Sequence, residues 1–512
     1  MTARMLTMLV PALCLAACQG GAPDDPGGAA DGGVIADADP LAPDADPNAP
    51  DADPLAPDAH LPPPGPDAGG IGARWHPSYL SLGTIYEGDT GADAFFTRVK
   101  PQFPSGKQLD YGYLYLNGGS QFSEWPHKVS QLIAGAERNH MTPVLVVYAM
   151  NGGSDSASAL FDDLQSATYV AQYASALVTA CESAADAAGD GLVGYILEPD
   201  MLGYLQQQYA ATYGNDPTQM PAATRALYTS GALAHGVDPE FPDTLAGFVQ
   251  GVNHVIRKHG GPNAFLGWQV NLWGAPGGGG KGVVHATETD GLTAGRTKIR
   301  AVASATADFA MRAGVGAAGA EMIVIDKYGL DGGGAAGTDP ANPADSYWFW
   351  NADLWSNYAL FVARVHELTG LPVVMWQIPV GHLEVTTHAS PSAFNASGHF
   401  PALDNTIQHY EDAASSWIFG DAFDLSGARL AYFKKNDAGD PGVSVSGSRV
   451  TYAAHFGALA DAGVVAVLFG AGVGVATRGV PQPSGANLDQ PTDGYYWITR
   501  AAEYYAHPLS LP

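Results

Sequence analysis

Two carboxylic acids follow a short apolar run at one point in the chain. Glu198 and Asp200, separated by Pro199, come directly after the segment YIL at residues 195–197. A charge is costly to bury unless it is paired or used. Two neighbouring carboxyls can serve as a proton donor and its partner, because like-charge repulsion raises the pKa of one of them. The spacing predicts an acid-base site, with an exposed, merely charged strand end as the alternative.

The orientation of these two side chains follows from the pleat of a strand. Successive side chains point to opposite faces, so Glu198 and Asp200 share one face if the pleat continues through residue 200. Pro199 has no N–H and stops regular pairing there. We therefore expect both carboxylates to face the same side of the site.

Amides, carboxylates and aromatic residues also lie near the ends of other apolar segments. Such a set suits a carbohydrate, because hydroxyl groups pair with amides and carboxylates and sugar rings stack on aromatic faces. Asp326 is the candidate base or substrate ligand, with Asp331 as an alternative on the same segment. The candidate substrate-binding residues are Tyr148, Asn151, Asp155, Trp268, Asn271, Trp273, Lys327, Tyr328, Trp376, Gln377 and His382.

These residues must be positioned by eight apolar segments that alternate with amphipathic helical patterns. Continuous apolar strands between helices indicate parallel pairing through right-handed crossovers. Eight such units predict an α/β fold, a (β/α)8 TIM-type barrel, whose chemistry lies at the carboxyl ends of the strands. An open doubly wound sheet is the alternative, but the nucleotide loop typical of its first strand is missing. The segments begin at Leu80, Leu109, Thr142, Gly191, Ala264, Glu321, Leu371 and Gly463.

Motifs for other chemistries are incomplete. The stretch GAPGGGGKG at 274–282 has Ala275 where a phosphate loop needs glycine, and HELTG at 366–370 ends in glycine where a zinc helix needs its second histidine. A Gly-x-Ser-x-Gly elbow of esterases is also missing. We expect neither a metal nor another cofactor.

The segment YILEPDML resembles the Glu-Pro-Asp signature of glycoside hydrolase family 6 cellulases. The resemblance implies that Asp200 is the general acid, and it extends upstream to VVYAMNGGSDSAS, where Tyr148 matches a tyrosine near the reaction centre. Asn151 and Gly153 replace the family's proline and arginine, and Asp155 comes one place after its second aspartate. The resemblance to these cellulases implies an extracellular enzyme that cleaves a polysaccharide.

The seventh apolar segment lacks the glutamate that a retaining mechanism would need. Retaining barrels of the large cellulase clan carry a glutamate there, whereas this chain has Gln377. A double displacement has no obvious nucleophile, which favours an inverting mechanism with a water-activating base. Which of Glu198 and Asp200 is the acid stays open, as do the sugar and its linkage. The alternative function is a surface protein that binds carbohydrate without cleaving it.

The composition and the N-terminal sequence bear on the partners of the protein and on its location in the cell. A net charge of −28 disfavours nucleic acid and anionic lipid as partners, since both need basic patches. Residues 1–18 read as a secretory signal ending in Leu-Ala-Ala-Cys, which resembles a bacterial lipobox with Cys18 as the lipidated residue; a plain signal peptide is the alternative. We expect export and a lipid anchor at the outer membrane or cell surface.

The rest of the chain divides into two parts. Residues 19–70 contain three Asp/Pro/Ala-rich heptads (DADPLAP, DADPNAP, DADPLAP), which predict a disordered, extended linker because proline forbids helix and the composition cannot form a core. Residues 71–512 are predicted to form one catalytic barrel domain, acting as a monomer.

Overall fold

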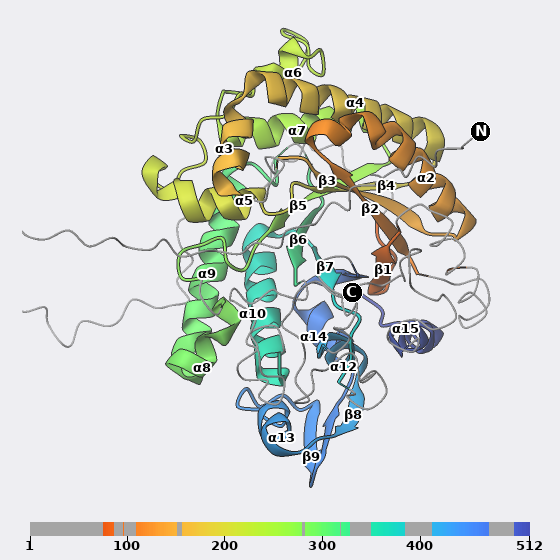
Figure 1. Ribbon diagram of the computed structural model, residues 1–512, viewed down its shortest axis with the longest axis vertical. Helices are drawn as coiled ribbons and strands as arrows, with labels where there is room; N and C mark the ends of the chain where they lie inside the picture. Colours follow the sequence, from red (N-terminus) through yellow and green to blue (C-terminus); the bar gives the residue numbers. More distant parts are fainter. Residues whose placement is uncertain are drawn as a thin grey trace, which may run out of the picture.

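Eight parallel strands close into a barrel in the computed structural model of the protein, which confirms the predicted fold class (Figure 1). The structure describes residues 75–86, 96, 109–150, 156–278, 282–317, 319–327, 350–383, 412–470 and 496–511. Each strand matches one predicted apolar segment. They are β1 (Ser81–Ile85), β2 (Tyr111–Asn117), β3 (Thr142–Tyr148), β4 (Val193–Leu197), β5 (Ala264–Val270), β6 (Met322–Asp326), β7 (Val373–Ile378) and β11 (Val464–Phe469).

Neighbouring strands in the chain are neighbours in the barrel, and β1 closes it by pairing with β11. The register sets the height of the polar residues at the carboxyl ends. Asn117 pairs with Tyr148, and Asp326 pairs with Trp376. The carboxyl ends of β2, β3, β6 and β7 therefore bring side chains to the same mouth of the barrel.

Helices cover the outside of the barrel, and their ends carry the expected capping residues. Ser166 accepts a hydrogen bond from the Tyr169 N–H at the start of α4, and Thr244 does the same for Gly247 at the start of α7. The longer helices are α2 (Trp125–Arg138), α3 (Ala157–Gln165), α4 (Ala167–Ala188), α7 (Leu245–Gly260), α9 (Leu292–Arg312), α10 (Ala352–Thr369) and α15 (Tyr496–Ala506). The shorter ones are α5 (Met201–Tyr204), α6 (Ala226–Thr229), α8 (Ala286–Asp290), α12 (Ala414–Phe419), α13 (Gly427–Phe433) and α14 (Phe456–Asp461).

An addition that the sequence did not predict lies between β7 and β11. The strands β8 (Asp421–Asp424), β9 (Val443–Ser446) and β10 (Arg449–Tyr452) form a separate antiparallel sheet in the order β8-β10-β9. Figure 1 shows β8, β9 and α13 together at the bottom of the view, away from α4 and α7.

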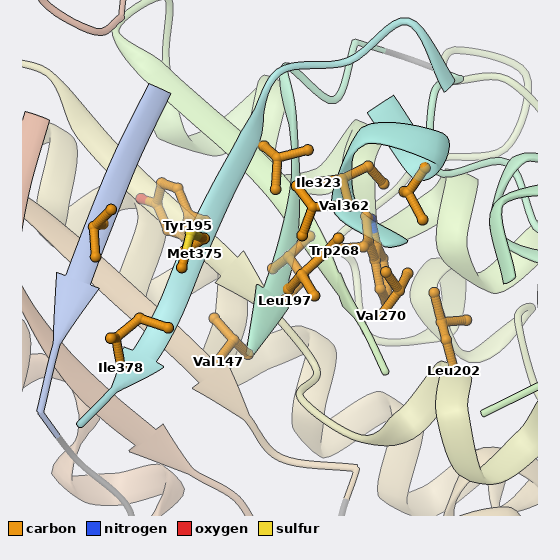
Figure 2. Packing of buried hydrophobic residues seen from close by; sticks show 14 of the residues in the cluster. Val147, Tyr195, Leu197, Leu202, Trp268, Val270, Ile323, Val362, Met375 and Ile378 are labelled. Atoms are coloured by element: carbon orange, nitrogen blue, oxygen red, sulfur yellow. The ribbon is translucent and has the colours of Figure 1, made fainter. Parts of the chain in front are cut away.

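The core has two layers, as alternation along each strand requires. Residues inside the barrel, such as Val146, Ile196 and Val324, form one buried cluster, which includes Trp75. Residues on the outer face of the strands pack with the helices in a larger cluster. Figure 2 shows part of this outer layer, with Leu197 and Trp268 from strands beside Val362 of α10.

The two ends of the domain meet beside β1. The Leu80 N–H donates to the Leu509 carbonyl at 2.9 Å, and the Leu511 N–H donates to the Ser78 carbonyl at 2.8 Å. In the part of the chain that the structure describes, no helix is long and apolar enough to cross a membrane.

Candidate active site at the carboxyl ends of the strands

Asp200 and Asp326 both bind amide side chains at the end of β5, where Gln269 lies in the strand and Asn271 directly follows it. Asn271 Nδ2 donates to Asp200 Oδ1 at 2.7 Å. Gln269 Nε2 donates to Asp326 Oδ1 at 2.5 Å, and its Oε1 accepts from the Asp200 N–H at 2.8 Å. The two carboxylates thus belong to one network that spans the ends of β4, β5 and β6.

The network is mostly shielded from water. Asp326 is 4% exposed and Asn271 is 1% exposed, whereas Asp200 is half-buried and faces partly into solvent. Hydrogen bonds to charged groups are stronger in such surroundings than in water. The arrangement presents one accessible carboxyl group and one sheltered carboxylate.

Glu198 does not share the mouth of the barrel with Asp200, and this corrects the expected orientation. The pleat stops at Leu197, because Glu198 and Asp200 both have positive φ angles, +43° and +66°. Glu198 is completely buried, and its Oε2 accepts from the N–H groups of Ala149 and Met150 at 3.0 and 2.8 Å. This carboxyl therefore binds the backbone at the end of β3.

Burial raises the pKa of Glu198 from 4.5 to about 7. The two backbone N–H groups oppose this shift because they stabilise the anion. The Tyr173 hydroxyl also lowers the pKa of Glu198, although the two groups form no hydrogen bond of standard geometry. The raised pKa comes mainly from burial.

The raised pKa of Glu198 predicts that stability falls as the pH rises from about 4.5 to about 7. The folded protein holds this proton up to about pH 7 and the unfolded chain releases it near pH 4.5. The favourable contribution is complete below pH 4.5 and is lost through pH 7, a change of about 3 kcal/mol at 1.36 kcal/mol per pH unit. Melting temperatures of the wild type and Glu198→Gln between pH 4.5 and 8 test this. The melting temperature of Glu198→Gln should not show this part of the decline with pH. If the melting temperatures of the two proteins change with pH in parallel, the raised pKa does not belong to Glu198.

β7 contains a bulge that changes the direction of its side chains. Three steps of β7, from Met375 to Ile378, match two steps of β11. Gln377 takes a φ of +53°, and its Nε2 donates to the Tyr115 hydroxyl from β2. Bulges are a common device for re-aiming a side chain near a functional site. The bulge brings Gln377 to the inner side of the strand beside Trp376.

Tyrosines of β2 and β3 complete this side of the mouth. The Tyr115 ring lies 5.8 Å from Trp376 and 6.4 Å from Tyr148. Tyr115 and Tyr148 are half-buried, but Trp376 is 1% exposed. Its indole N–H has no hydrogen-bond partner in the described part of the chain. The edge of Trp376, and not its face, is the part suited to a ligand.

Backbone strain concentrates at this end of the barrel. In the described residues, five non-glycine residues have positive φ, and three of them, Glu198, Asp200 and Gln377, follow β4 or lie in the β7 bulge. Such conformations cost about 1–3 kcal/mol each and cluster at active sites. Their position supports a functional site independently of residue type.

Trp273 and α5 form one wall beside Asp200. The rings of Trp273 and Tyr204 lie 5.0 Å apart, and Trp273 is half-buried. A Cβ atom on Gly203 would lie 2.3 Å from Asn271 Oδ1 and 2.9 Å from the Trp273 ring. Only glycine at this position lets α5 approach the end of β5 so closely.

We expect Gly203→Ala to lower activity on a cleavable substrate about 10- to 100-fold, because Asn271 must move and it holds Asp200. Overpacking should also cost about 1–3 kcal/mol of stability. Kinetics below the melting temperature separate the two effects. The control is Gly457→Ala in α14, where an added Cβ meets nothing within 4 Å. Equal behaviour of both variants would contradict the role of Gly203.

Three predicted substrate-binding residues are buried, and two of them, Trp268 and Lys327, have partners within the fold. Trp268 is on the outer face of β5, fully buried, and donates to Asn253 of α7 at 2.7 Å. Lys327 is also fully buried, and its Nζ lies 3.1 Å from Asp412. His382 is buried beyond the end of β7. Trp268 and Lys327 therefore have contacts that stabilise the fold, and neither presents a surface to a sugar.

Other predicted positions lie outside the described residues: Asn151, Asp155, Tyr328, the alternative Asp331, Cys18 and the linker 19–70. They stay predictions.

Two residues of the site were not predicted from the sequence. Gln269 lies two positions before Asn271, so strand alternation places both on the inner face of β5. Tyr115 lies two positions before Asn117 in the same way. The sequence pattern that could have identified them is a polar residue two positions before a polar residue at the end of a strand. Among the described residues, no group of three or more histidines, cysteines and acids could hold a metal ion.

Neither a protein-family profile nor a curated protein matches the sequence. Solved structures do match over part of the chain. An endoglucanase, Cel6, from Mycobacterium tuberculosis is 13% identical, with 60% of this chain and 78% of that chain covered and a TM-score of 0.30. The endoglucanase CEL6B from Humicola insolens is 12% identical, with 60% of this chain and 78% of that chain covered and a TM-score of 0.31. The spore cortex-lytic enzyme SleL from Bacillus cereus is 9% identical, with 82% of this chain and 74% of that chain covered and a TM-score of 0.34. Similarity at this level assigns no activity to the chain.

Proposed function

We propose that the protein is a glycoside hydrolase that cleaves a polysaccharide, with Asp200 as the general acid. The network in which Gln269 links Asp200 to Asp326 and Asn271 holds the Asp200 carboxyl carries this proposal. Glycoside cleavage needs one carboxyl that protonates the leaving oxygen and one carboxylate that acts on the other side of the bond. The carboxyl ends of parallel barrel strands are the usual place for such a pair.

The hydrogen bonds assign a direction to the proton of Asp200. Asn271 Nδ2 can only donate, so Oδ1 of Asp200 accepts and the acidic proton sits on Oδ2. The backbone N–H of Asp200, held by Gln269, fixes the residue from the other side. Asp200 can then give its proton to a glycosidic oxygen without first reorienting.

Asp326 is the proposed base. Its Oδ1 is occupied by Gln269, which fixes the carboxylate for an approaching water or sugar hydroxyl. Because a water must fit between base and sugar, the proposal predicts inversion at the anomeric carbon. Proton NMR of the first product formed distinguishes inversion from retention.

The remaining residues of the mouth suit a neutral sugar. Tyr148 and Tyr115 present half-buried rings with hydroxyl groups, and Trp273 presents a half-buried ring beside Asp200. The Trp376 N–H can donate to a substrate hydroxyl, and Gln377 supplies an amide. A polysaccharide of neutral sugars would meet no charge repulsion from a chain of net charge −28.

The deciding experiment incubates the purified protein with glucans, xylan, mannan and chitin and measures new reducing ends. Hydrolysis of one polymer, lost in Asp200→Asn, supports the proposal. Binding to a polymer without any release of reducing ends would instead favour the non-catalytic, carbohydrate-binding alternative. A protein that neither binds nor cleaves any of them overturns both.

We also propose that the protein is exported and held at the cell envelope by lipid on Cys18, on the basis of its Leu-Ala-Ala-Cys context. Cys18→Ser should remove it from the membrane fraction or leave it unprocessed, because each buried acyl methylene contributes about 0.8 kcal/mol to anchoring. Fractionation with an antibody against the barrel domain tests this. Unchanged membrane association would remove the lipid-anchor proposal while leaving the enzymatic one intact.

A further inference from the structure

Glu198 connects two parts of the mouth through the backbone. Its Oε2 accepts from two successive N–H groups, those of Ala149 and Met150, directly after Tyr148 on β3. After the end of β4, Glu198 precedes Asp200 by two residues, with a rigid proline between them. The spacing between Tyr148 and Asp200 therefore depends on this carboxyl in addition to the backbone bond from the Glu198 N–H to the Val147 carbonyl at 2.8 Å.

We propose that Glu198 is a positioning residue whose buried carboxyl ties the end of β3 to the end of β4, and that this tie changes with its protonation. For its effect on activity, the inference rests on the proposed function. The structural part does not, because the tie can be measured in a protein that cleaves nothing.

The same backbone is held from its other side by α4. The Tyr169 hydroxyl donates to the Ala149 carbonyl at 2.6 Å. Residue 149 is thus fixed through its N–H by Glu198 and through its carbonyl by Tyr169. A segment held at both its donor and its acceptor has little freedom to shift unless one of the two bonds is released.

The surroundings of Glu198 explain why its charge state matters. The titratable groups that face it are Tyr169 and Tyr173 of α4. Burial raises the pKa of both phenols above the ordinary value of 10, so both are neutral at any pH at which the protein works. An ionised Glu198 is therefore stabilised by dipoles: two N–H groups and a hydroxyl.

The hydrogen bonds strengthen when Glu198 ionises, because charge-assisted bonds are about twice as strong as neutral ones. With the pKa raised to about 7, this change falls in the neutral range. The raised pKa means that the cost of burying the charge exceeds this gain, so opening of the tie, which hydrates Glu198, becomes easier as the pH rises toward 7.

Amide hydrogen exchange at residues 149 and 150 tests the tie directly. We expect Glu198→Ala to lower protection of these two amides at least about tenfold, and Glu198→Gln to preserve it, since the amide oxygen still accepts. In the wild type, protection corrected for intrinsic exchange should fall between about pH 5 and pH 7, because an opening that exposes these amides also hydrates Glu198 and lets it ionise, and in Glu198→Gln this fall should be missing.

The matched control is Glu321→Ala. Glu321 is a half-buried glutamate that also accepts from a backbone N–H, that of Leu266 at 2.9 Å, but it directly precedes β6 at the amino end of the strand and is paired with Arg257. Its loss should destabilise the protein without changing exchange at residues 149 and 150. If Glu321→Ala and Glu198→Ala have the same effect there, or if Glu198→Ala leaves protection intact, the inference is overturned.

Kinetics on a cleavable polymer provide the second readout. Glu198→Ala should lower kcat by about 10- to 100-fold, the range expected when reacting groups are displaced by about 1 Å, with a smaller change in KM. Glu198→Gln should keep kcat within a few fold but lose a limb of the pH profile near 7. An inactive Glu198→Gln would make Glu198 a catalytic acid and refute the positioning role. Altered exchange in a protein with no hydrolysis would refute the proposed function alone.

Discussion

Asp200→Asn should reduce the cleavage of an unactivated glycan by roughly a thousandfold or more, in the range of losing a general acid and its positioning. The variant should still fold, because an amide can keep the hydrogen bond from Asn271 and Asp200 is half-buried. Initial rates of reducing-end release at matched protein concentration measure the effect. An equal melting temperature shows that the loss is chemical.

Substrates with different leaving groups show whether the rate loss in Asp200→Asn comes from missing general-acid catalysis. Aryl glycosides with good leaving groups need little protonation, so Asp200→Asn should affect them much less. Asp190→Asn is the matched control, because Asp190 is exposed and precedes the amino end of β4. Near-normal turnover of a natural polymer by Asp200→Asn would show that the carboxyl at the end of β4 is not the acid.

Lys327→Met should cause the largest loss of stability among these variants, about 3–5 kcal/mol, because it leaves the Asp412 carboxylate buried without its cation. The Lys327 ammonium is 0% exposed and lies 3.1 Å from Asp412. It also lies 4.9 Å from the ring of Trp350 and 5.8 Å from that of Trp355. Burial raises the pKa of Asp412 and Lys327 opposes that shift, so the two charges depend on each other.

A double variant tests this explanation. In Lys327→Met with Asp412→Asn no buried charge is left, and the asparagine can still accept from the Ala414 N–H. It should unfold in urea at a higher concentration than Lys327→Met alone. Arg449→Met, which breaks the exposed pair with Asp424, should cost less than about 1 kcal/mol. A loss in Lys327→Met no greater than in Arg449→Met would contradict the account.

The barrel could be predicted because its signals are local. Each strand is an apolar run bounded by turn residues, and α4 spans 22 residues with an amphipathic pattern that is visible in the sequence. The inner position of Asn271 also follows from alternation along β5. Trp268 obeys the same rule from the other side, because a residue one position from an inward glutamine must point outward.

The rest of the site depends on breaks in these local rules. The φ angles of Glu198 and Asp200 end the pleat, so an argument from alternation fails at the residue where it is applied. The bulge at Gln377 is a mismatch between two strands that are far apart in sequence. The pairing of Lys327 with Asp412 joins residues 85 positions apart. A residue pattern along one strand contains none of this information.

The meeting of the two ends of the domain beside β1 has a consequence for biosynthesis. Every barrel strand pairs with one already made, except β1, which must wait for β11. At about 5–20 residues per second, its free edge is exposed for roughly 20–80 s while the intervening residues are translated. An open parallel sheet with a bare edge is a template for association with other chains. We therefore expect the nascent chain to need protection, by a chaperone or by being kept unfolded, until β11 has left the ribosome.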